Sequence, residues 1–208
     1  MSKSPFMIFQ DFLSPKQCDA ILDQVRLVAP NLDKEGNPAK MERFHNDAED
    51  QIFDKFQPLI PQIEAHYDLK HKGTERLLFQ CFPEGMATIA EAPHCESSAM
   101  VRKKWVKVRD RDLTGILWLK DHQHEPPLDL KTEVYGGKLE FPIYNFSLQP
   151  QRGTLVLYPA GPHFITATSQ VLVGDLYAVR FHIAADGIWI YQPSNFPGNY
   201  VEWFAEHA

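Results

Sequence analysis

The N-terminal part of the chain carries a helical pattern over residues 14–28. Ser14 stands at an N-cap position, Pro15 at the first helical position, and Gln17 three residues after the cap. Apolar side chains then recur at helical spacing on one face, at Cys18, Ile21, Leu22, Val25 and Val28. The pattern predicts a helix that packs this face against a core.

A polar stretch over residues 31–47 separates this helix from a second amphipathic segment. Gly36 and Pro38 interrupt the stretch, which predicts a loop. Residues 48–66 then repeat apolar positions at helical spacing, and the stripe consists of Ile52, Phe53, Phe56, Leu59, Ile60 and Ile63. Because Pro58 and Pro61 lie inside this segment, we expect the second helix to kink.

Beyond Glu75 the pattern changes to short apolar runs that are rich in β-branched and aromatic residues. The runs span residues 76–82, 86–91, 113–119, 138–141, 154–158, 163–167, 176–184 and 187–191. Helices followed by short strands predict a mainly β, α+β fold, an antiparallel sandwich or jelly roll buttressed by helices. We expect one domain over 1–208, with helical support over about 1–74, a jelly-roll core over about 75–191 and an aromatic tail over 192–208.

Length and composition narrow the class of protein. The chain has 208 residues, of which 44% are hydrophobic and 23% charged, and this excludes a disordered chain or a coiled-coil rod. Its three cysteines lack CxxC spacing, so neither a disulfide framework nor a cysteine zinc site is expected. No apolar run approaches the roughly 20 residues of a membrane helix, and a secretory signal is not recognisable. These features predict a soluble, cytoplasmic protein without a membrane partner.

The charge is distributed unevenly along the chain. A formal net charge of −6 argues against a surface that binds nucleic acid throughout. Residues 102–111, however, hold six basic side chains against Asp110 alone, which leaves −11 for the rest of the chain. The expected substrate loop consists of Arg102, Lys103, Lys104, Trp105, Lys107 and Arg109. This segment predicts either a contact with an anionic partner, with the indole available for stacking, or a solvated hairpin.

Candidate chemistry lies in the segment GMATIAEAPHCESS. His94 and Glu96 stand two residues apart, so on a strand both side chains project from one face. His163, after the Gly-Pro turn in YPAGPH, is the candidate third ligand. Two histidines and one carboxylate form the facial triad of non-haem Fe(II) oxygenases. The alternative is that this triplet is a chance pairing and that the histidines are surface residues.

The order of several motifs resembles that of a known family. LTGILWLKD (113–121), YGGKLEFP (135–142) and PQRGTLVLYPAGPH (150–163) follow the first two candidate ligands, and IFQDFLSPKQCDAIL lies near the N-terminus. Over residues 6–184 this order resembles the Fe(II)/2-oxoglutarate-dependent dioxygenases of the prolyl 4-hydroxylase-like branch. GGKLEFP is its most specific part. The resemblance implies a double-stranded β-helix, the cupin-like jelly roll.

The resemblance also implies an activity and a metal site. His94, Glu96 and His163 would bind Fe(II), with Glu96 standing where the family usually has Asp. The implied enzyme uses O2 and 2-oxoglutarate, hydroxylates a C–H bond and releases succinate and CO2, with ascorbate as an accessory reductant. Its implied substrate is a prolyl residue of a peptide or protein, or a related small molecule.

The expected cosubstrate anchor departs from the family pattern. In the hydroxylase branch a basic residue follows two positions after the glycine that here is Gly174, and this position holds Leu176. Arg180 lies four residues further along the same predicted strand and faces the same way, so we expect it to hold the distal carboxylate. The alternative is an ordinary ion pair. Residues expected to line the pocket are Thr114, Tyr177 and Trp118.

Two other functions remain open from the sequence. The position of Arg180 and the basic segment favour a nucleic-acid oxidative demethylase of the same superfamily, although RFHIAAD lacks a second arginine. Glu96 and Leu176 favour a jelly-roll binding or structural module without turnover. The substrate and the oligomeric state are also open.

Further segments are expected to surround the site. DHQHEPPLDLKTEV (121–134) is interpreted as a lid beside the mouth, with His122 and His124 as surface residues. The residues expected to wall the barrel are Ile89, Ile116, Leu139 and Phe141. The aromatic tail is expected to cap the open end of the roll.

Overall fold

A computed structural model describes residues 4–28, 40–43, 47–88, 98–102, 104–123, 129–149 and 151–186. The first helix, α1 (Pro15–Val28), begins as the sequence predicts. The backbone N–H of Gln17 donates to Ser14 Oγ at 3.3 Å, and that of Ser14 donates to Gln17 Oε1 at 3.0 Å. This reciprocal pair satisfies two backbone donors at the start of the helix, which is why the chain turns into it here.

The second predicted helix is interrupted where its prolines lie. It consists of α2 (Asp47–Phe56), the 3-10 turn η1 (Gln57–Leu59) and α3 (Ile60–Tyr67). Pro58 and Pro61 have no backbone N–H to continue the ladder, so the chain changes helix type between them. Asp68 then adopts a left-handed conformation with a φ of 53° and ends α3. No helix of the described part of the chain is long and apolar enough to cross a membrane.

Seven strands form the large sheet. Their order is β1 (Met7–Phe9), β12 (Leu155–Pro159), β7 (Leu113–Trp118), β15 (Leu176–Asp186), β4 (Leu78–Phe82) and β2 (Lys40–Arg43), and β3 (Lys70–Thr74) also pairs with β15. Every pair in this sheet is antiparallel. The 11-residue strand β15 contacts three other strands and is therefore the centre of the fold.

Shorter strands form the rest of the roll. One sheet has the order β11 (Phe146–Leu148), β10 (Leu139–Phe141) and β13 (Ala167–Thr168), with the 3-10 turn η2 (Pro142–Tyr144) between β10 and β11. Another has the order β14 (Val171–Val173), β9 (Glu133–Gly136) and β8 (Asp121–Gln123), and its β8–β9 pair is parallel. β5 (Ser98–Val101) and β6 (Lys104–Lys107) form a separate hairpin.

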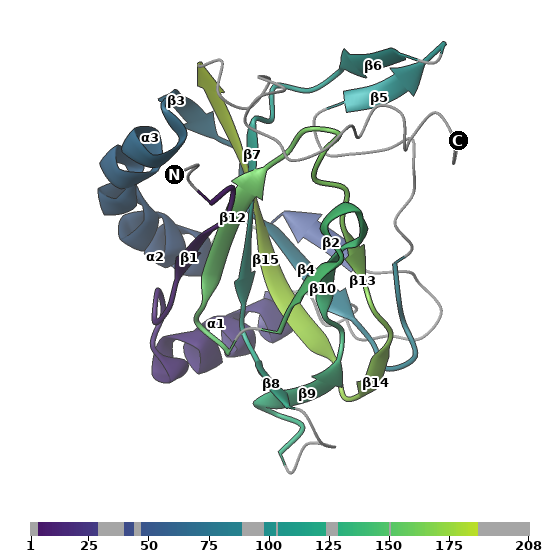
Figure 1. Cartoon of the computed structure of the whole chain (residues 1–208). Helices are drawn as coiled ribbons and strands as arrows, with labels where there is room; N and C mark the ends of the chain where they lie inside the picture. Colours follow the sequence, from purple (N-terminus) through teal and green to yellow (C-terminus); the bar gives the residue numbers. More distant parts are fainter. Residues whose placement is uncertain are drawn as a thin grey trace.

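Two apolar cores lie on opposite faces of the large sheet. Helices cover one face, and β10, β13 and β14 lie on the other (Figure 1). Val179 and Phe181 of β15 belong to the core under the helices, whereas Leu176 and Ala178 belong to the core inside the roll. This alternation follows from the two-residue period of a strand. The predicted jelly roll with helical buttresses is confirmed.

The local differences from the predicted elements are confined to short or polar strands. The predicted loop 31–47 contains β2, and the predicted strand 163–167 shortens to β13 at its end. The described part of the predicted strand 86–91 forms one bridge, between Thr88 and Thr168. Residues 89–91 and the predicted strand 187–191 lie outside the described residues. β2 and β3 have no apolar run in the sequence, and they are strands because β2 pairs with β4 and β3 pairs with β15.

Candidate functional site

The inner face of the large sheet is polar at one end. Tyr158, Thr114 and His182 lie side by side on β12, β7 and β15, and the next row contains Ile116 and Arg180. Thr114 is fully buried, and its Oγ1 has no hydrogen-bond partner among the described residues. A buried hydroxyl of this kind is normally satisfied by water or ligand, so this end of the roll is suited to bind a polar group.

Arg180 reaches into a narrow cavity within the roll. Its Nε donates a hydrogen bond to Gln80 Oε1 at 3.1 Å, and Thr168 is a third polar residue of the lining. The apolar walls are formed by Phe82, Ile116, Trp118, Leu139 and Leu176. The cavity is small, with a volume of about 10 Å³, which is room for about one water molecule. One cation among apolar walls is an arrangement that recognises a carboxylate.

Leu176 stands where the family resemblance implies the cosubstrate anchor, and it lines the same cavity as Arg180. The two residues are both on the inner face of β15, as their equal facing in the sequence predicts. Trp118 also lies in this cavity, whereas Thr114 belongs to the polar row beyond it. The structure therefore brings Arg180 and Trp118 together and places Thr114 one row nearer the end of the roll.

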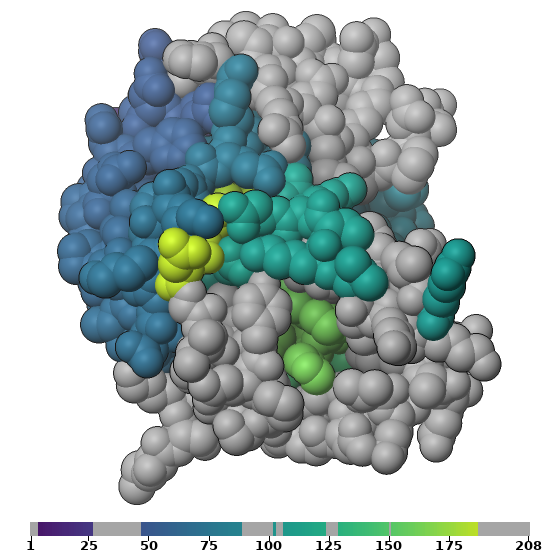
Figure 2. Space-filling view, turned by 90° about the horizontal axis from the view of Figure 1, so that it is seen from above, coloured from purple at the N-terminus to yellow at the C-terminus, as the bar shows by residue number. Residues whose placement is uncertain are grey.

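His163 lies in the turn that follows β12, at the same end of the roll as the polar row. The preceding Ala160 donates its N–H to the carbonyl of Asp112 at 2.9 Å, and Phe164 donates to Gly161 at 2.9 Å, so the turn is held from both sides. Burial of the imidazole lowers the pKa of His163. Neutral imidazole is the form that binds metal. In Figure 2 the green segment after β12 reaches the surface beside the teal residues of the β6–β7 region.

The other two predicted ligands, His94 and Glu96, lie outside the described residues. Within the described ranges, no group of three or more His, Cys, Asp or Glu side chains is placed to hold a metal ion. The structure therefore places one member of the predicted triad, and the complete ligand set stays a prediction.

Tyr177 does not line the Arg180 cavity, contrary to the sequence-based expectation. Its ring lies on the helix side of the sheet, 5.1 Å from the Arg26 guanidinium carbon of α1 and 5.2 Å from Lys120 Nζ. The expectation was wrong because neighbouring residues of a strand face opposite sides, so a strand that points Arg180 inward points Tyr177 outward. The ring joins α1 to β15 instead.

Some charges of the basic segment are neutralised within the protein. Arg111 is buried and pairs with Glu75, with Nε to Oε1 at 2.7 Å and Nη2 to Oε2 at 2.9 Å. Lys107 Nζ contacts Asp110 at 3.1 Å and Asp112 at 2.9 Å. Lys103 lies outside the described residues, as do the side chains of Lys104 and Trp105, while Arg102 and Arg109 are exposed. The segment thus carries less uncompensated charge than its composition indicates.

The predicted lid over 121–134 does not border the His163 end. β8 and β9, which hold much of this segment, lie at the opposite end of the roll (Figure 1). His122 is buried, not a surface residue, and its Nε2 lies 3.1 Å from the carbonyl oxygen of Gly137. The parallel pairing of β8 with β9 turns this side chain inward. His124 lies outside the described residues.

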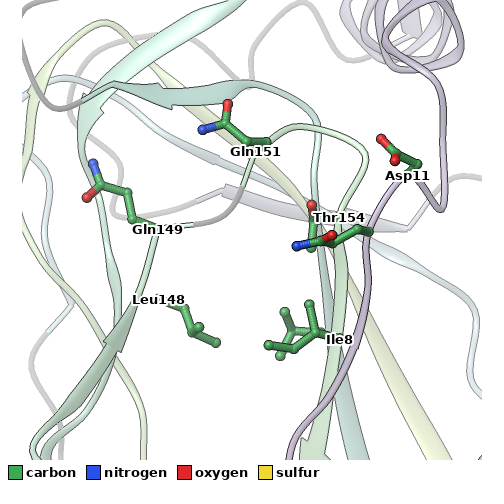
Figure 3. Close-up of a pocket in the computed structure, with 8 residues that line it drawn as sticks. Ile8, Asp11, Leu148, Gln149, Gln151 and Thr154 are labelled. Carbon is green, nitrogen blue, oxygen red and sulfur yellow. The ribbon is translucent and has the colours of Figure 1, made fainter.

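A separate groove opens where the edges of two sheets part. Figure 3 shows Ile8 of β1 facing Leu148 of β11, with the amides of Gln149 and Gln151 and the hydroxyl of Thr154 around them. The groove has a volume of about 470 Å³ and is much larger than the Arg180 cavity. It holds no cation in its lining, so it does not share the chemistry of the candidate site.

Comparisons with known proteins identify the fold. No protein-family model matches the chain, and no curated protein matches its sequence. Among solved structures, a viral collagen prolyl hydroxylase from Paramecium bursaria Chlorella virus-1 has a TM-score of 0.63 at 15% identity, over 88% of this chain and 97% of that one. The chain has the fold of the prolyl hydroxylases. A Pseudomonas putida prolyl-4-hydroxylase has a TM-score of 0.62 at 15% identity, over 88% and 94% of the two chains.

A third prolyl hydroxylase of this fold, from Trichoplax adhaerens, was solved with a peptide fragment of the hypoxia-inducible factor oxygen degradation domain. Its TM-score is 0.58 at 15% identity, over 86% of this chain and 83% of that one. The viral prolyl hydroxylase was solved as a 2OG complex. All three likenesses cover most of both chains, so the shared fold includes the helical layer as well as the roll.

The sequence did not single out Gln80, Thr168 or His182, which the prolyl hydroxylase fold brings to the inner face of the roll. Gln80 and Thr168 line the Arg180 cavity, and His182 joins the polar row. The sequence contains one indication that Gln80 has a special role, since it is the one polar residue within the apolar run LFQCF.

Proposed function

We propose that the chain is an Fe(II)- and 2-oxoglutarate-dependent oxygenase that hydroxylates a prolyl residue of a peptide. The observation that carries this proposal is the position of Arg180 in an apolar cavity inside a prolyl hydroxylase fold. A guanidinium that faces such a cavity can hold a carboxylate ligand through charge-assisted hydrogen bonds.

The side chains that line the cavity suit the distal carboxylate of 2-oxoglutarate. A guanidinium donates to a carboxylate through two parallel N–H bonds, and apolar walls strengthen that interaction by excluding water. Thr168 and the unsatisfied Thr114 hydroxyl can donate to oxygens of the same ligand. The residues present therefore suit a 2-oxo diacid.

The metal site would combine His163 with His94 and Glu96. His163 suits this role because burial favours its neutral form and the turn that carries it is held at Ala160 and Phe164. When bound, Fe(II) would supply the activation of O2 and the oxidative decarboxylation of the cosubstrate. The chain itself would orient the diacid through Arg180 and keep bulk water out of the roll.

A peptide substrate is supported by two observations. The Trichoplax neighbour binds a peptide, and the β5–β6 hairpin of this chain stands at the end of the roll where His163 lies (Figure 1). Val106 and Val108 are 44% and 53% exposed on this hairpin, and Arg102 and Arg109 are exposed near them. Apolar and basic side chains together suit an extended, acidic peptide.

Cosubstrate binding provides the test. The protein is loaded with Fe(II) without oxygen, 2-oxoglutarate is added, and the metal-to-ligand charge-transfer band and, after O2, succinate are measured. We expect both signals, loss of the metal in His163→Ala, and at least a tenfold weaker affinity for 2-oxoglutarate in Arg180→Ala with the metal retained. A folded protein that gives neither signal would instead be a jelly-roll module without turnover.

Recognition of an acidic peptide is tested separately. The KM for a proline-containing acidic peptide should rise about two- to fivefold in an Arg102→Ala, Arg109→Ala double variant, since rim charges contribute modestly. Added salt should raise the KM of the parent protein toward the same value. A KM that neither change affects would remove the basic segment from the binding site.

A further inference from the structure

Gln80 contacts the proposed cosubstrate anchor directly. It lies in the middle of β4, is 3% exposed, and lines the same cavity as Arg180. In the strand register Gln80 is opposite Ala178, and Arg180 is opposite Leu78. The hydrogen bond from Arg180 Nε to Gln80 Oε1, 3.1 Å long, therefore runs diagonally across two strands.

This diagonal bond directs the guanidinium along the strand. Arg180 is four residues beyond Leu176, which is about 13 Å in a strand. Because Gln80 is level with Ala178, the bond directs the arginine back toward Leu176, and both residues line one cavity. A bond at Nε also orients the plane of the guanidinium, so that a carboxylate would meet its Nη1–Nη2 edge.

A neutral partner has a specific advantage at this position. Buried arginines are commonly held by carboxylates, which cancel their charge. The Gln80 amide holds Nε without adding a negative charge to the cavity, and its NH2 group is a donor that can also serve an anionic ligand. The Gln80 side chain thus orients Arg180 without itself cancelling the positive charge.

From this geometry we infer that Gln80 is the positioning residue of Arg180 and that it sets the preference of the site for 2-oxo acids with a distal carboxylate. The inference rests on the proposed function, because it takes Arg180 as the anchor. Gln80 would act through Arg180, and its effect would therefore depend on whether the ligand has a second carboxylate.

The test compares two ligands in five proteins. Dissociation constants for 2-oxoglutarate and for 2-oxobutyrate, which lacks the distal carboxylate, are measured by calorimetry. The proteins are the Mn(II)-loaded parent, Gln80→Leu, Gln80→Glu, Arg180→Ala and Gln151→Leu. Gln151 lies in the separate groove and is the matched control. Affinity for Mn(II) and the unfolding midpoint are measured for each variant.

We expect Gln80→Leu to weaken 2-oxoglutarate binding about tenfold, because it removes a hydrogen bond to a charged group. Gln80→Glu is nearly isosteric and keeps an acceptor for Nε, yet it should weaken binding at least as much, because its charge competes with the ligand. The affinities for 2-oxobutyrate and Mn(II) should stay within twofold of the parent. Gln151→Leu should match the parent throughout.

Three results would overturn the inference, and they differ in whether the proposed function is contradicted as well. If Gln80→Leu and Gln80→Glu bind 2-oxoglutarate like the parent while Arg180→Ala binds it more weakly, only the role of Gln80 is contradicted. Equal losses for both ligands and for Mn(II) show a structural role only. A parent protein that does not bind 2-oxoglutarate removes the proposed function together with the inference.

Discussion

Among the glycines in the described part of the chain, Gly153 leaves the least room for a side chain. Its φ is +78°, and a Cβ at this position would collide with the carbonyl of Leu13. The N–H of Gly153 donates to Trp118 at 2.7 Å, and its carbonyl accepts from Leu13 at 3.0 Å. Through these two hydrogen bonds, Gly153 links the residues just before α1 to the end of β7, a strand of the candidate site.

Gly153→Ala should lower the free energy of unfolding by about 2 kcal/mol or more, since both the backbone conformation and the contact oppose a side chain. Urea denaturation measures the loss. Gly73→Ala is the control, because no atom lies within 4 Å of its Cβ position and its φ is negative. Equal losses in both variants would contradict this account.

Cys18 provides a second test at the residue scale. It lies on the core-facing side of α1 and is fully buried, and burial raises the pKa of its thiol to about 12. The thiolate is the reactive form, so the native protein at pH 8 should leave Cys18 unmodified by iodoacetamide, and urea should expose it. Peptide mapping by mass spectrometry measures the modification, and rapid labelling of Cys18 in the native protein would contradict the structure.

Helix α1 depends on its capping pair. Ser14→Ala removes the acceptor of the Gln17 N–H and should cost about 1 kcal/mol in the free energy of unfolding. Lys16→Ala, an exposed change in the same turn, should leave stability within about 0.5 kcal/mol of the parent. Denaturation curves compare the two, and a similar cost for both would show that the cap contributes little.

The elements that the sequence predicted share a strong local signal. α1 has its cap and stripe, and β7, β12 and β15 have continuous apolar runs because both of their faces are buried. β2, β3, β8 and β9 could not be predicted in this way, since their pairing partners, not their own composition, make them strands. The burial of His122 could not be predicted from the sequence either, because it depends on the pairing of β8 with β9.

Within the candidate site, residue spacing was more informative than residue type. The two-residue period placed Arg180 on the inner face of β15, and the same rule, applied to Tyr177, places that ring outside the cavity. Gln80 and Thr168 could not be assigned to the cavity from the sequence, because their contact with Arg180 depends on how distant strands are paired.

At the scale of the whole molecule, the large sheet joins two cores, and we propose that they unfold together. Phe181 is fully buried and its ring centroid lies 5.2 Å from that of Phe56. Phe181→Ala should cost roughly 3–5 kcal/mol. Amide exchange should accelerate in β10 and β13, on the other side of the sheet, as much as in α2. Faster exchange in α2 alone would show two independent units.

The strand register of β15 determines whether a folded molecule can form the candidate site. A slip of one residue would turn Arg180 toward the helices and Phe181 into the cavity, while the content of strand would hardly change. Two bonds near the end of β15 oppose such a slip, from Glu75 N–H to the His182 carbonyl at 2.8 Å and from Ala185 N–H to Asp112 at 2.9 Å. Spectra that report only secondary structure would therefore count misaligned molecules as native, and the fraction that binds ligand is the sounder measure of a preparation.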